Sequence, residues 1–245
     1  MPVIRIEPFE PEMAAEASQV LARAYVTNPL HLAAFGPDQL AKKDAFFRKG
    51  LTVMKGPNLV ALEGPRILGL IHWVHSPDCQ LSGLEKLRLT PAMISGFGLR
   101  SALRVSTWLS TWSKHDPKES HLHLGPIGVE PAAQGRHIGQ HLMGLYCEEL
   151  DRIEVAGYLE TDRPQNVSFY RRFGFETTGE VSVLGVRNYL MWREAQSGST
   201  ANRAPRAATR RPPTSQGMRD RAGGEVVGGS LPRRTGGGAL PTEMT

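Results

Sequence analysis

The stretch Leu124-Gly-Pro-Ile-Gly-Val-Glu-Pro-Ala-Ala-Gln-Gly-Arg-His-Ile-Gly-Gln-His-Leu142 carries the strongest structural signal in the sequence. It is typical of a strand ending near Val129, a short turn, and a long helix with glycines at its start. Apolar residues recur at steps of three and four from Ile138 to Ile153, the spacing of a helix with one buried face. We therefore predict a strand–loop–helix unit whose helix spans 135–153.

The start of this helix is a candidate phosphate-binding site. Glycine lets a ligand approach the backbone closely, the first-turn N–H groups have no partner inside the helix, and the helix dipole favours negative charge there. Arg136 adds a positive charge. A Walker loop does not fit, because Gln140-His141 follows Gly139 where Lys-Ser/Thr is needed. The glycines at 135, 139 and 144 do not form a dinucleotide fingerprint either, and a plain tight turn is the structural alternative.

Strands and helices alternate along the rest of the chain. We expect helices over 11–25, 37–51 and 167–173, and strands over 3–6, 58–63, 66–74, 121–129, 157–161, 175–180 and 185–193. The segment 77–120 is interpreted as a long insertion, in which apolar residues from Phe97 to Trp112 recur at near-helical spacing. This order predicts an α/β fold with a mixed sheet.

Composition excludes several classes of protein. The 245 residues are 40% hydrophobic and 22% charged, and the mean hydropathy is −0.30, as in ordinary globular proteins. We find no apolar run near the ~18 residues of a membrane span and no signal-peptide pattern at the start. Cys79 and Cys147 are far apart and form no CxxC pair. This excludes a disulfide scaffold and a cysteine-built zinc site, and it favours a reducing cytoplasm.

The net charge of +5 arises entirely from the C-terminal segment 196–245, which holds eight arginines and three acidic residues. The remainder, 1–195, has a net charge of zero and is expected to form one domain with a single core. The segment 196–245 is rich in Gly, Pro and Arg and lacks aromatic residues, so we predict a disordered tail. An arginine arm for nucleic acid is the alternative, but the neutral domain and the scattered arginines disfavour it.

A second constellation follows the loop by about 25 residues: Leu159-Glu-Thr-Asp-Arg-Pro-Gln-Asn166-Val-Ser-Phe-Tyr170-Arg-Arg-Phe-Gly-Phe175. Together the two stretches resemble the GCN5-related N-acetyltransferase (GNAT) superfamily. Residues 134–139 match its acetyl-CoA motif, Gln/Arg-x-x-Gly-x-Gly/Ala, and 166–175 match its Asn-x-x-Phe-Tyr-x-x-x-Gly-Phe signature. The second run also resembles the puromycin-resistance acetyltransferases. The resemblance covers 120–193 well and 1–76 loosely, and His137 departs from it by standing where the motif usually has glycine.

The resemblance implies a GNAT-like mixed, splayed central sheet flanked by helices. The strand ending at Val129 would diverge from its neighbour at Glu160, and the backbone of 127–129 would pair with the pantetheine arm of acetyl-CoA. The same stretch is equally suited to a core strand. The implied acetyl-CoA-binding residues are Ile127, Gly128, Val129, Gln134, Gly135, Arg136, His137, Ile138, Gly139, Gln140, Asn166 and Tyr170.

Acetyl transfer to an amine needs a neutral amine, a polarised thioester carbonyl and a proton for the leaving thiolate. The resemblance implies that Tyr170 supplies this proton, although a half-buried core tyrosine is the alternative. For the base, His121 and His123 share one face of their strand, Glu160 lies on the neighbouring strand, and Glu63 is a further candidate. Our preferred catalytic set is Tyr170, His123 and Glu160. His-x-His on a strand can bind zinc, but no matching Cys or carboxylate spacing accompanies it, so we expect no metal.

The predicted function is therefore transfer of the acetyl group of acetyl-CoA to a small-molecule amine, by direct attack in a ternary complex. The alternative is a non-catalytic acetyl-CoA-binding module that acts as a sensor or partner protein, which His137 would favour. Phe97, Trp108 and Trp112 of the insertion could line an apolar acceptor pocket, or simply pack a helix on the sheet. No nucleic-acid or membrane partner is expected. The apolar run 188–192 indicates a strand buried on both faces or a homodimer contact, and the sequence leaves this choice open.

Overall fold

The computed structural model describes residues 3–53, 55–56, 58–79 and 82–196. The predicted tail, apart from Gln196, therefore lies outside the described residues. The helices are α1 (Ala14–Ala24), α2 (Pro29–Phe35), α3 (Leu40–Val53), α4 (Gly83–Phe97), α5 (Leu99–His115), α6 (Ile138–Ile153) and α7 (Pro164–Arg171). The strands are β1 (Ile4–Pro8), β2 (Asn58–Glu63), β3 (Arg66–His75), β4 (His121–Val129), β5 (Ala156–Thr161), β6 (Glu176–Val183) and β7 (Val186–Arg193). Two short 3₁₀ turns cover Pro11–Met13 and Pro131–Ala133.

The strands form one mixed sheet in the order β1-β2-β3-β4-β5-β7-β6. All neighbours run antiparallel except β4 and β5, which are parallel. These two pair only over His121–His123 and Ala156–Tyr158, although β4 continues to Val129 and β5 to Thr161. The sheet is therefore splayed at its centre, as the family resemblance implied.

An extra residue in β4 accounts for the divergence. Ile71 of β3 pairs with Ile127, and Trp73 pairs with Leu124, so two steps along β3 correspond to three along β4. The surplus falls at Gly125-Pro126. A bulge bends its strand and increases the local twist, and proline has no N–H to offer a neighbouring strand. β4 is thus bent at the point where its pairing with β5 stops.

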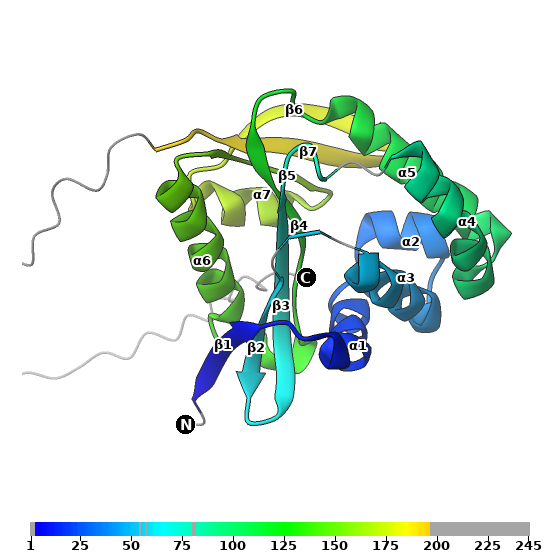
Figure 1. The fold of residues 1–245 in the computed structure, drawn as a ribbon, viewed down its shortest axis with the longest axis horizontal. Coiled ribbons are helices and arrows are strands. Elements are labelled where there is room, and N and C mark those ends of the chain that lie inside the picture. Colours follow the sequence, from blue (N-terminus) through cyan, green and yellow to red (C-terminus); the bar gives the residue numbers. More distant parts are fainter. Residues whose placement is uncertain (1–2, 54, 57, 80–81, 197–245) are drawn as a thin grey trace, which may run out of the picture. The chain divides into compact units, whose positions relative to one another are not determined.

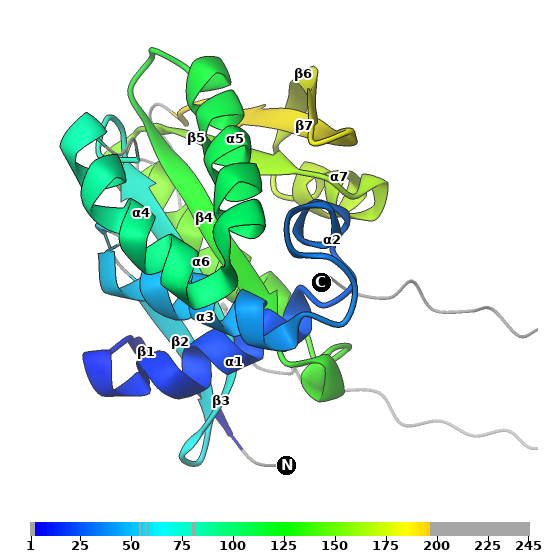
Figure 2. The same cartoon turned by 90° about the vertical axis from the view of Figure 1, so that its right-hand side faces the viewer.

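Helices cover both faces of the sheet (Figures 1 and 2). The apolar stripe of α6, including the fully buried Leu142, Tyr146 and Leu150, packs on β3, β4 and β5. On the opposite face, α1 and α3 pack on β2 and β3 around Leu21 and Phe47. A third apolar cluster joins α2 and α5 to the β6–β7 hairpin. No helix among the described residues is long and apolar enough to cross a membrane.

Most predicted elements are confirmed within a few residues, and three differences matter. α2 lies in 26–36, for which no helix was predicted; it begins at Pro29 after an Asn28 cap whose side chain accepts from His31 N. The insertion consists of two helices, α4 and α5, instead of one helical stretch. α6 begins at Ile138 and not at Gly135, because Gly135 (φ 78°) and His137 (φ 62°) adopt left-handed conformations that a helix excludes.

The apolar run near the C-terminal end of the domain is explained within one chain. β7 lies between β5 and β6 and pairs with both. Asn188 and Met191 are fully buried, and Leu190 is nearly so. A strand in the interior of a sheet that is covered on both faces is expected to contain apolar residues in succession. The first of the two predicted explanations for this run therefore suffices.

Candidate active site

The amides of Ile127 and Val129 face the gap between β4 and β5. Glu130 N donates to the Leu68 carbonyl at 2.8 Å, so after the bulge the ladder bonds to β3 fall on Gly128 and Glu130, and the backbone groups of Ile127 and Val129 turn away from β3. The Ile127 carbonyl accepts from Tyr25 Oη at 3.0 Å and the Val129 carbonyl from Gln134 Nε2 at 3.3 Å. The N–H groups of these two residues are therefore the backbone groups suited to bind a ligand. The prediction that the backbone of 127–129 pairs with the pantetheine arm is thus reduced to two N–H donors.

Gly128 has a packing role in the sheet, and its predicted role in coenzyme binding stays a prediction. Its register partner is Leu70 of β3, so its own polar groups belong to the β3–β4 ladder. A Cβ added to Gly128 would lie 2.9 Å from Leu21 Cδ2 and 3.2 Å from Ala24 Cβ, both on α1. The close packing of α1 on the sheet therefore explains why glycine is needed at this position.

The loop before α6 has the form of an anion site. A Cβ added to Gly135 would meet nothing within 4 Å, so the backbone is open to a ligand there. The next turns bring the amides of Ile138, Gly139 and Gln140 into the first turn of the 16-residue helix α6, where they have no partner within the helix. Ile138 itself is buried in the core, so it can contribute only its backbone.

Arg136 is already engaged. Its Nη2 lies 2.6 Å from Glu63 Oε1 at the end of β2. The positive charge predicted for a phosphate is thus shared with a carboxylate. This contact also places Glu63 beside the α6 loop instead of in the cavity described below, which removes the geometric basis for Glu63 as a catalytic base.

His137 occupies the left-handed region that glycine favours, with φ 62° and ψ 13°. Its Nδ1 lies 3.1 Å from Gln140 Oε1, and its side chain is exposed. The backbone thus takes the turn that the family's glycine would permit, and the imidazole lies on the surface.

Substitutions at His137 are expected to report this backbone strain. A left-handed residue other than glycine costs about 1–2 kcal/mol, and a β-branched side chain is worse still. We expect His137→Gly to be at least as stable as the natural protein and His137→Val to be about 2 kcal/mol less stable than His137→Gly, as measured by urea unfolding. Both variants lose the Gln140 contact, so their difference isolates the backbone. Equal stability of the two variants would contradict the left-handed turn.

A cavity of about 330 Å³ opens on the α1–α5 side of the sheet. It brings together residues predicted separately: His123 and Glu160 from the splayed strands, and Asn166 and Tyr170 from α7. Asn166 and Tyr170 are one helical turn apart, as the signature requires. Phe97, Trp108 and Trp112 of the insertion also line it. They pack against α2 and the β6–β7 hairpin as well, so they have a structural role whether or not the cavity receives the acceptor.

Tyr170 is buried, with 5% of its surface exposed. Burial raises the pKa of its phenol, and the nearby Tyr25 and Asp162 raise it further. The group therefore keeps its proton across the physiological range, which is the protonation state required of a proton donor. Tyr25, a neighbour that sequence reasoning missed, is also held protonated, since burial raises its pKa while the bond to the Ile127 carbonyl opposes this.

His123 and Glu160 form a pair across the splayed strands. His123 Nε2 lies 2.9 Å from Glu160 Oε2, and the Glu160 side chain is only 2% exposed. Burial works against protonation of His123, but Glu160 and Asp116 outweigh it and raise its pKa well above the usual value. The Nε2 of His123 faces a carboxylate, which only accepts hydrogen bonds, so this nitrogen carries a hydrogen and is not placed to take a proton from a substrate. The catalytic role of His123 stays a prediction. Glu160 Oε1 is buried and makes no hydrogen bond within the described residues, so it is the better acceptor.

His121, the other histidine considered as a base, has no access to the cavity. It is fully buried, and its Nδ1 lies 2.7 Å from the Glu119 carbonyl. Burial opposes its protonation, but contacts with Asp116, Cys79 and the Glu119 carbonyl prevail and raise its pKa to about 9. His121 is not among the residues that line the cavity.

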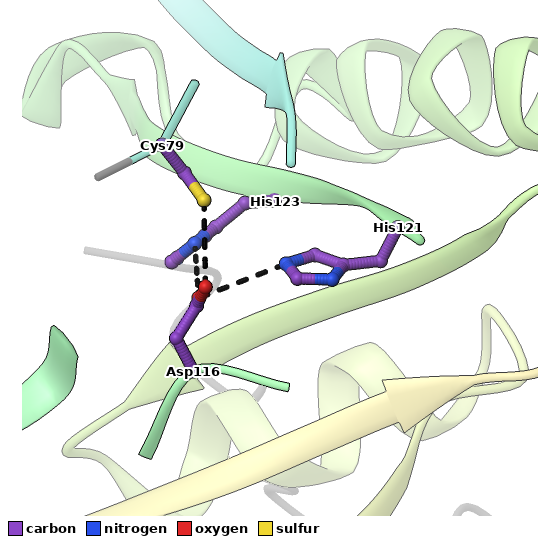
Figure 3. Close-up of side chains that lie close together, drawn as sticks. All are labelled: Cys79, Asp116, His121 and His123. Atoms are coloured by element: carbon purple, nitrogen blue, oxygen red, sulfur yellow. Dashed lines mark hydrogen bonds and ion pairs between the residues drawn. The ribbon is translucent and has the colours of Figure 1, made fainter. Parts of the chain in front are cut away.

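Two residues that sequence reasoning did not single out for the site, Cys79 and Asp116, join the histidine pair (Figure 3). Cys79 Sγ lies 3.5 Å from Asp116 Oδ2, and Asp116 Oδ1 lies 3.3 Å from His123 Nδ1 and 3.7 Å from His121 Nε2. Cys79 follows β3 and Asp116 follows α5, and the two residues are 37 positions apart in the sequence. The only part of the sequence that could have indicated this cluster is the run from Asp116 to His123, because Cys79 lies at the opposite end of the insertion.

Comparison with known proteins agrees with this architecture. Residues 107–177 match the family described as acetyltransferase (GNAT) domain. A solved structure described as histone acetyltransferase HPA2 and related acetyltransferase, from Corynebacterium glutamicum, is similar to this chain, with 20% sequence identity and a TM-score of 0.62. The match covers 81% of this chain and 99% of the Corynebacterium protein. A polyamine N-acetyltransferase from Drosophila melanogaster, which forms N-acetylagmatine, has 15% sequence identity to this chain and a TM-score of 0.51. That match covers 78% of this chain and 100% of the Drosophila protein. These likenesses establish the GNAT acetyltransferase fold.

Proposed function

We propose that this protein transfers the acetyl group of acetyl-CoA to the amine of a small acceptor, by direct attack in a ternary complex. The observation that carries this proposal is the single cavity in which the splayed strands meet Asn166 and Tyr170 of α7. The match of 107–177 to the acetyltransferase (GNAT) domain supports the chemistry.

The residues along the gap fit acetyl-CoA. The Ile127 and Val129 amides would bind the amides of the pantetheine arm as a neighbouring strand does, with Asn166 as a further polar contact. The amides from Gly135 to Gln140 would hold the pyrophosphate at the start of α6. When bound, acetyl-CoA supplies an acetyl thioester that a neutral amine can attack.

Tyr170 and Glu160 would move the protons. As the C–N bond forms and the C–S bond breaks, Tyr170 would donate its phenolic proton to the sulfur of the leaving thiolate, whose thiol has a pKa near ~8.5. The proton that the acetylated nitrogen must lose would return to Tyr170, so the phenol is restored. Glu160 Oε1, the buried oxygen without a hydrogen bond in the described part of the chain, would accept a proton from the acceptor ammonium. His123 would hold the other carboxylate oxygen in place. We thus assign His123 a positioning role.

The acceptor chemistry follows from the cavity wall. Aromatic side chains from α3 and α5 line it, including Phe46, Phe47 and Trp108. Rings of this kind favour an amine that carries an apolar or aromatic body. The similar Drosophila enzyme acts on a polyamine-type amine, and the resemblance of 159–175 to puromycin-resistance acetyltransferases points to an aromatic aminonucleoside. Both classes therefore belong in a substrate panel.

Release of free thiol from acetyl-CoA, measured with the full chain against a panel of amines, tests the proposal. We expect release that depends on the acceptor and is faster for arylalkylamines or aminonucleosides than for short aliphatic amines. Binding of acetyl-CoA without release across the whole panel would contradict an enzymatic role and select the alternative, a non-catalytic binding module.

A further inference from the structure

We propose that Cys79, Asp116, His121 and His123 form a zinc site of the closed, four-ligand kind. Within the described residues, one ligand atom from each of the four lies within 4.8 Å of the others. Figure 3 shows the four side chains converging from three separate segments: the end of β3, the end of α5, and β4. One thiolate, two imidazoles and a carboxylate are donors that Zn²⁺ binds in proteins.

The spacing of these atoms suits a tetrahedral ion. With Zn–S near ~2.3 Å and Zn–N or Zn–O near ~2.0 Å, neighbouring ligand atoms should lie about 3.3–3.5 Å apart. Asp116 Oδ1 lies 3.3 Å from His123 Nδ1 and 3.7 Å from His121 Nε2, and the other carboxylate oxygen, Oδ2, lies 3.5 Å from Cys79 Sγ. All four ligand atoms lie within 4.8 Å of one another, which is wider than an occupied site. Small side-chain shifts would therefore complete the coordination.

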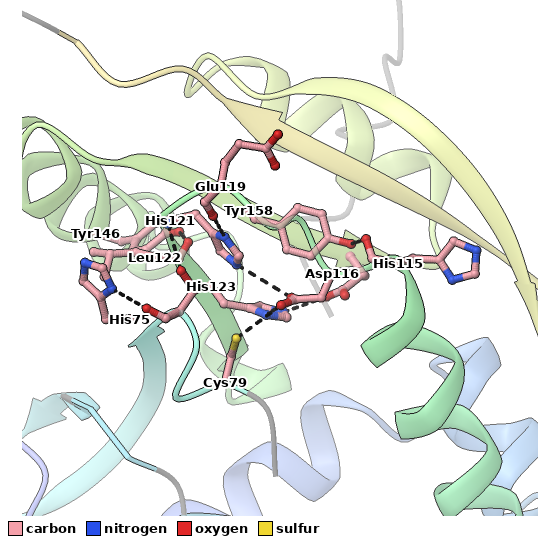
Figure 4. A network of polar contacts seen from close by, with 12 residues as sticks. His75, Cys79, His115, Asp116, Glu119, His121, Leu122, His123, Tyr146 and Tyr158 are labelled. Atoms are coloured by element: carbon pink, nitrogen blue, oxygen red, sulfur yellow. Dashed lines mark hydrogen bonds and ion pairs between the residues drawn. The ribbon is translucent and has the colours of Figure 1, made fainter. Parts of the chain in front are cut away.

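The outer contacts orient both imidazoles for this role, and Figure 4 shows the one between His121 and the Glu119 carbonyl. His121 Nδ1 faces the Glu119 carbonyl at 2.7 Å, and His123 Nε2 faces the Glu160 carboxylate at 2.9 Å. A carbonyl and a carboxylate only accept hydrogen bonds, so these two nitrogens carry the hydrogens. In the neutral tautomers, the lone pairs then lie on His121 Nε2 and His123 Nδ1. Such second contacts, a histidine–carboxylate pair above all, are characteristic of metal-bound histidine.

The two inward-facing nitrogens, His121 Nε2 and His123 Nδ1, are buried and make no hydrogen bond of good geometry within the described residues. Each faces Asp116 Oδ1, at 3.7 and 3.3 Å, so the ligand atoms of the cluster face one another. Buried polar atoms that are incompletely satisfied are costly. A thiolate and a carboxylate supply two negative charges, which a divalent cation would neutralise, so a bound ion would satisfy both the hydrogen-bonding and the charge requirements of the cluster.

The position of the ligands assigns the ion a structural task. Cys79 precedes α4 and Asp116 follows α5, so the two residues bracket the segment that carries both helices. His121 and His123 belong to β4 of the central sheet. An ion held by all four would tie both ends of that segment to the sheet. Because Trp108 and Trp112 of α5 line the cavity, the ion would also fix one wall of the acceptor pocket.

Metal loading of the full chain tests the site without any use of enzymatic activity. Protein stripped with a chelator and dialysed is titrated with Zn²⁺, and separately with Co²⁺ as an optical probe. We expect one equivalent of tightly bound Zn²⁺, tetrahedral Co²⁺ bands with a thiolate charge-transfer band, and a rise in Tm on adding Zn²⁺.

Matched variants locate the ion. Cys79→Ser should abolish the thiolate band and the Zn²⁺-dependent rise in Tm, whereas Cys147→Ser, which removes the other free cysteine, should retain both. Glu160→Gln should weaken Zn²⁺ binding by about 10–100-fold, as loss of a second contact to a histidine ligand does. Far-ultraviolet circular dichroism confirms that each variant is folded.

Two results would overturn the proposal: stripped natural protein that takes up no stoichiometric Zn²⁺ or Co²⁺, or a thiolate band that persists in Cys79→Ser and disappears in Cys147→Ser. Neither result depends on acetyl-CoA, so the zinc site can fail while the proposed acetyltransferase function stands, and the reverse also holds.

Discussion

Replacement of Tyr170 by phenylalanine is expected to lower kcat by about 10²–10⁴-fold, the usual contribution of a positioned proton donor. Phenylalanine retains the ring, so the contacts of Tyr170 with Phe169 and Phe175 persist. The affinity for acetyl-CoA should therefore change little. Steady-state kinetics with the best acceptor of the panel, together with a direct binding measurement, separates the two quantities.

Tyr146→Phe is the matched control for this experiment. Tyr146 is another fully buried tyrosine, and its hydroxyl donates to the Leu122 carbonyl at 2.6 Å, but it does not line the cavity. Its loss should cost stability and leave kcat within a few-fold of the natural value. If Tyr170→Phe retained full turnover, or if both variants lost it equally, Tyr170 would have no place in the mechanism.

A large effect of pH on stability is expected from His31. The ring is 3% exposed, stacks on Phe47 at 5.2 Å and contacts Tyr25 and Trp108. Burial, with a smaller contribution from the cation of Lys43, lowers the pKa of His31 to about 3. In the unfolded chain His31 would titrate near ~6.5. Below that pH the unfolded state therefore binds a proton on His31, whereas the folded state keeps this imidazole neutral down to about pH 3.

The stabilising effect of neutral His31 is therefore complete above about pH 6.5 and declines as the pH falls toward 3, at up to ~1.4 kcal/mol per pH unit. Between pH 7 and pH 4.5 we expect this residue to lower the free energy of unfolding by about 2.5 kcal/mol. Denaturant unfolding of the natural protein and of His31→Phe measures it, since acidic groups common to both cancel. If the free energies of unfolding of the two proteins changed with pH in parallel, His31 would have an ordinary pKa in the folded state.

The parts of the fold that the sequence predicted well are those whose signal is local. The apolar period of α6, the hairpin of β2 and β3, and the spacing of Asn166 and Tyr170 on one helix each lie within a short window. The motif at 134–139 located the α6 loop but placed the helix start three residues early. Only the backbone shows that Gly135 and His137 are left-handed.

The features that escaped prediction depend on contacts between distant segments. From the sequence, the charge of Arg136 was expected to be available to a phosphate. In the fold, Glu63 forms an ion pair with it from 73 positions away. The Cys79 thiol and the histidines of β4 were each judged alone as weak metal ligands, because spacing along the chain was the only available criterion. The helices α4 and α5 bring the two ends of their segment together, and this proximity has no sequence signature.

The most direct test of the proposed site is nuclear magnetic resonance titration of acetyl-CoA into the ¹⁵N-labelled full chain, with Asn166→Ala as the weakened variant. We expect saturable shifts concentrated at the amides of Ile127, Val129 and residues 135–140, and the same pattern at higher ligand concentration in the variant. Shifts confined to other surfaces, or none at all, would contradict acetyl-CoA binding in the gap between β4 and β5.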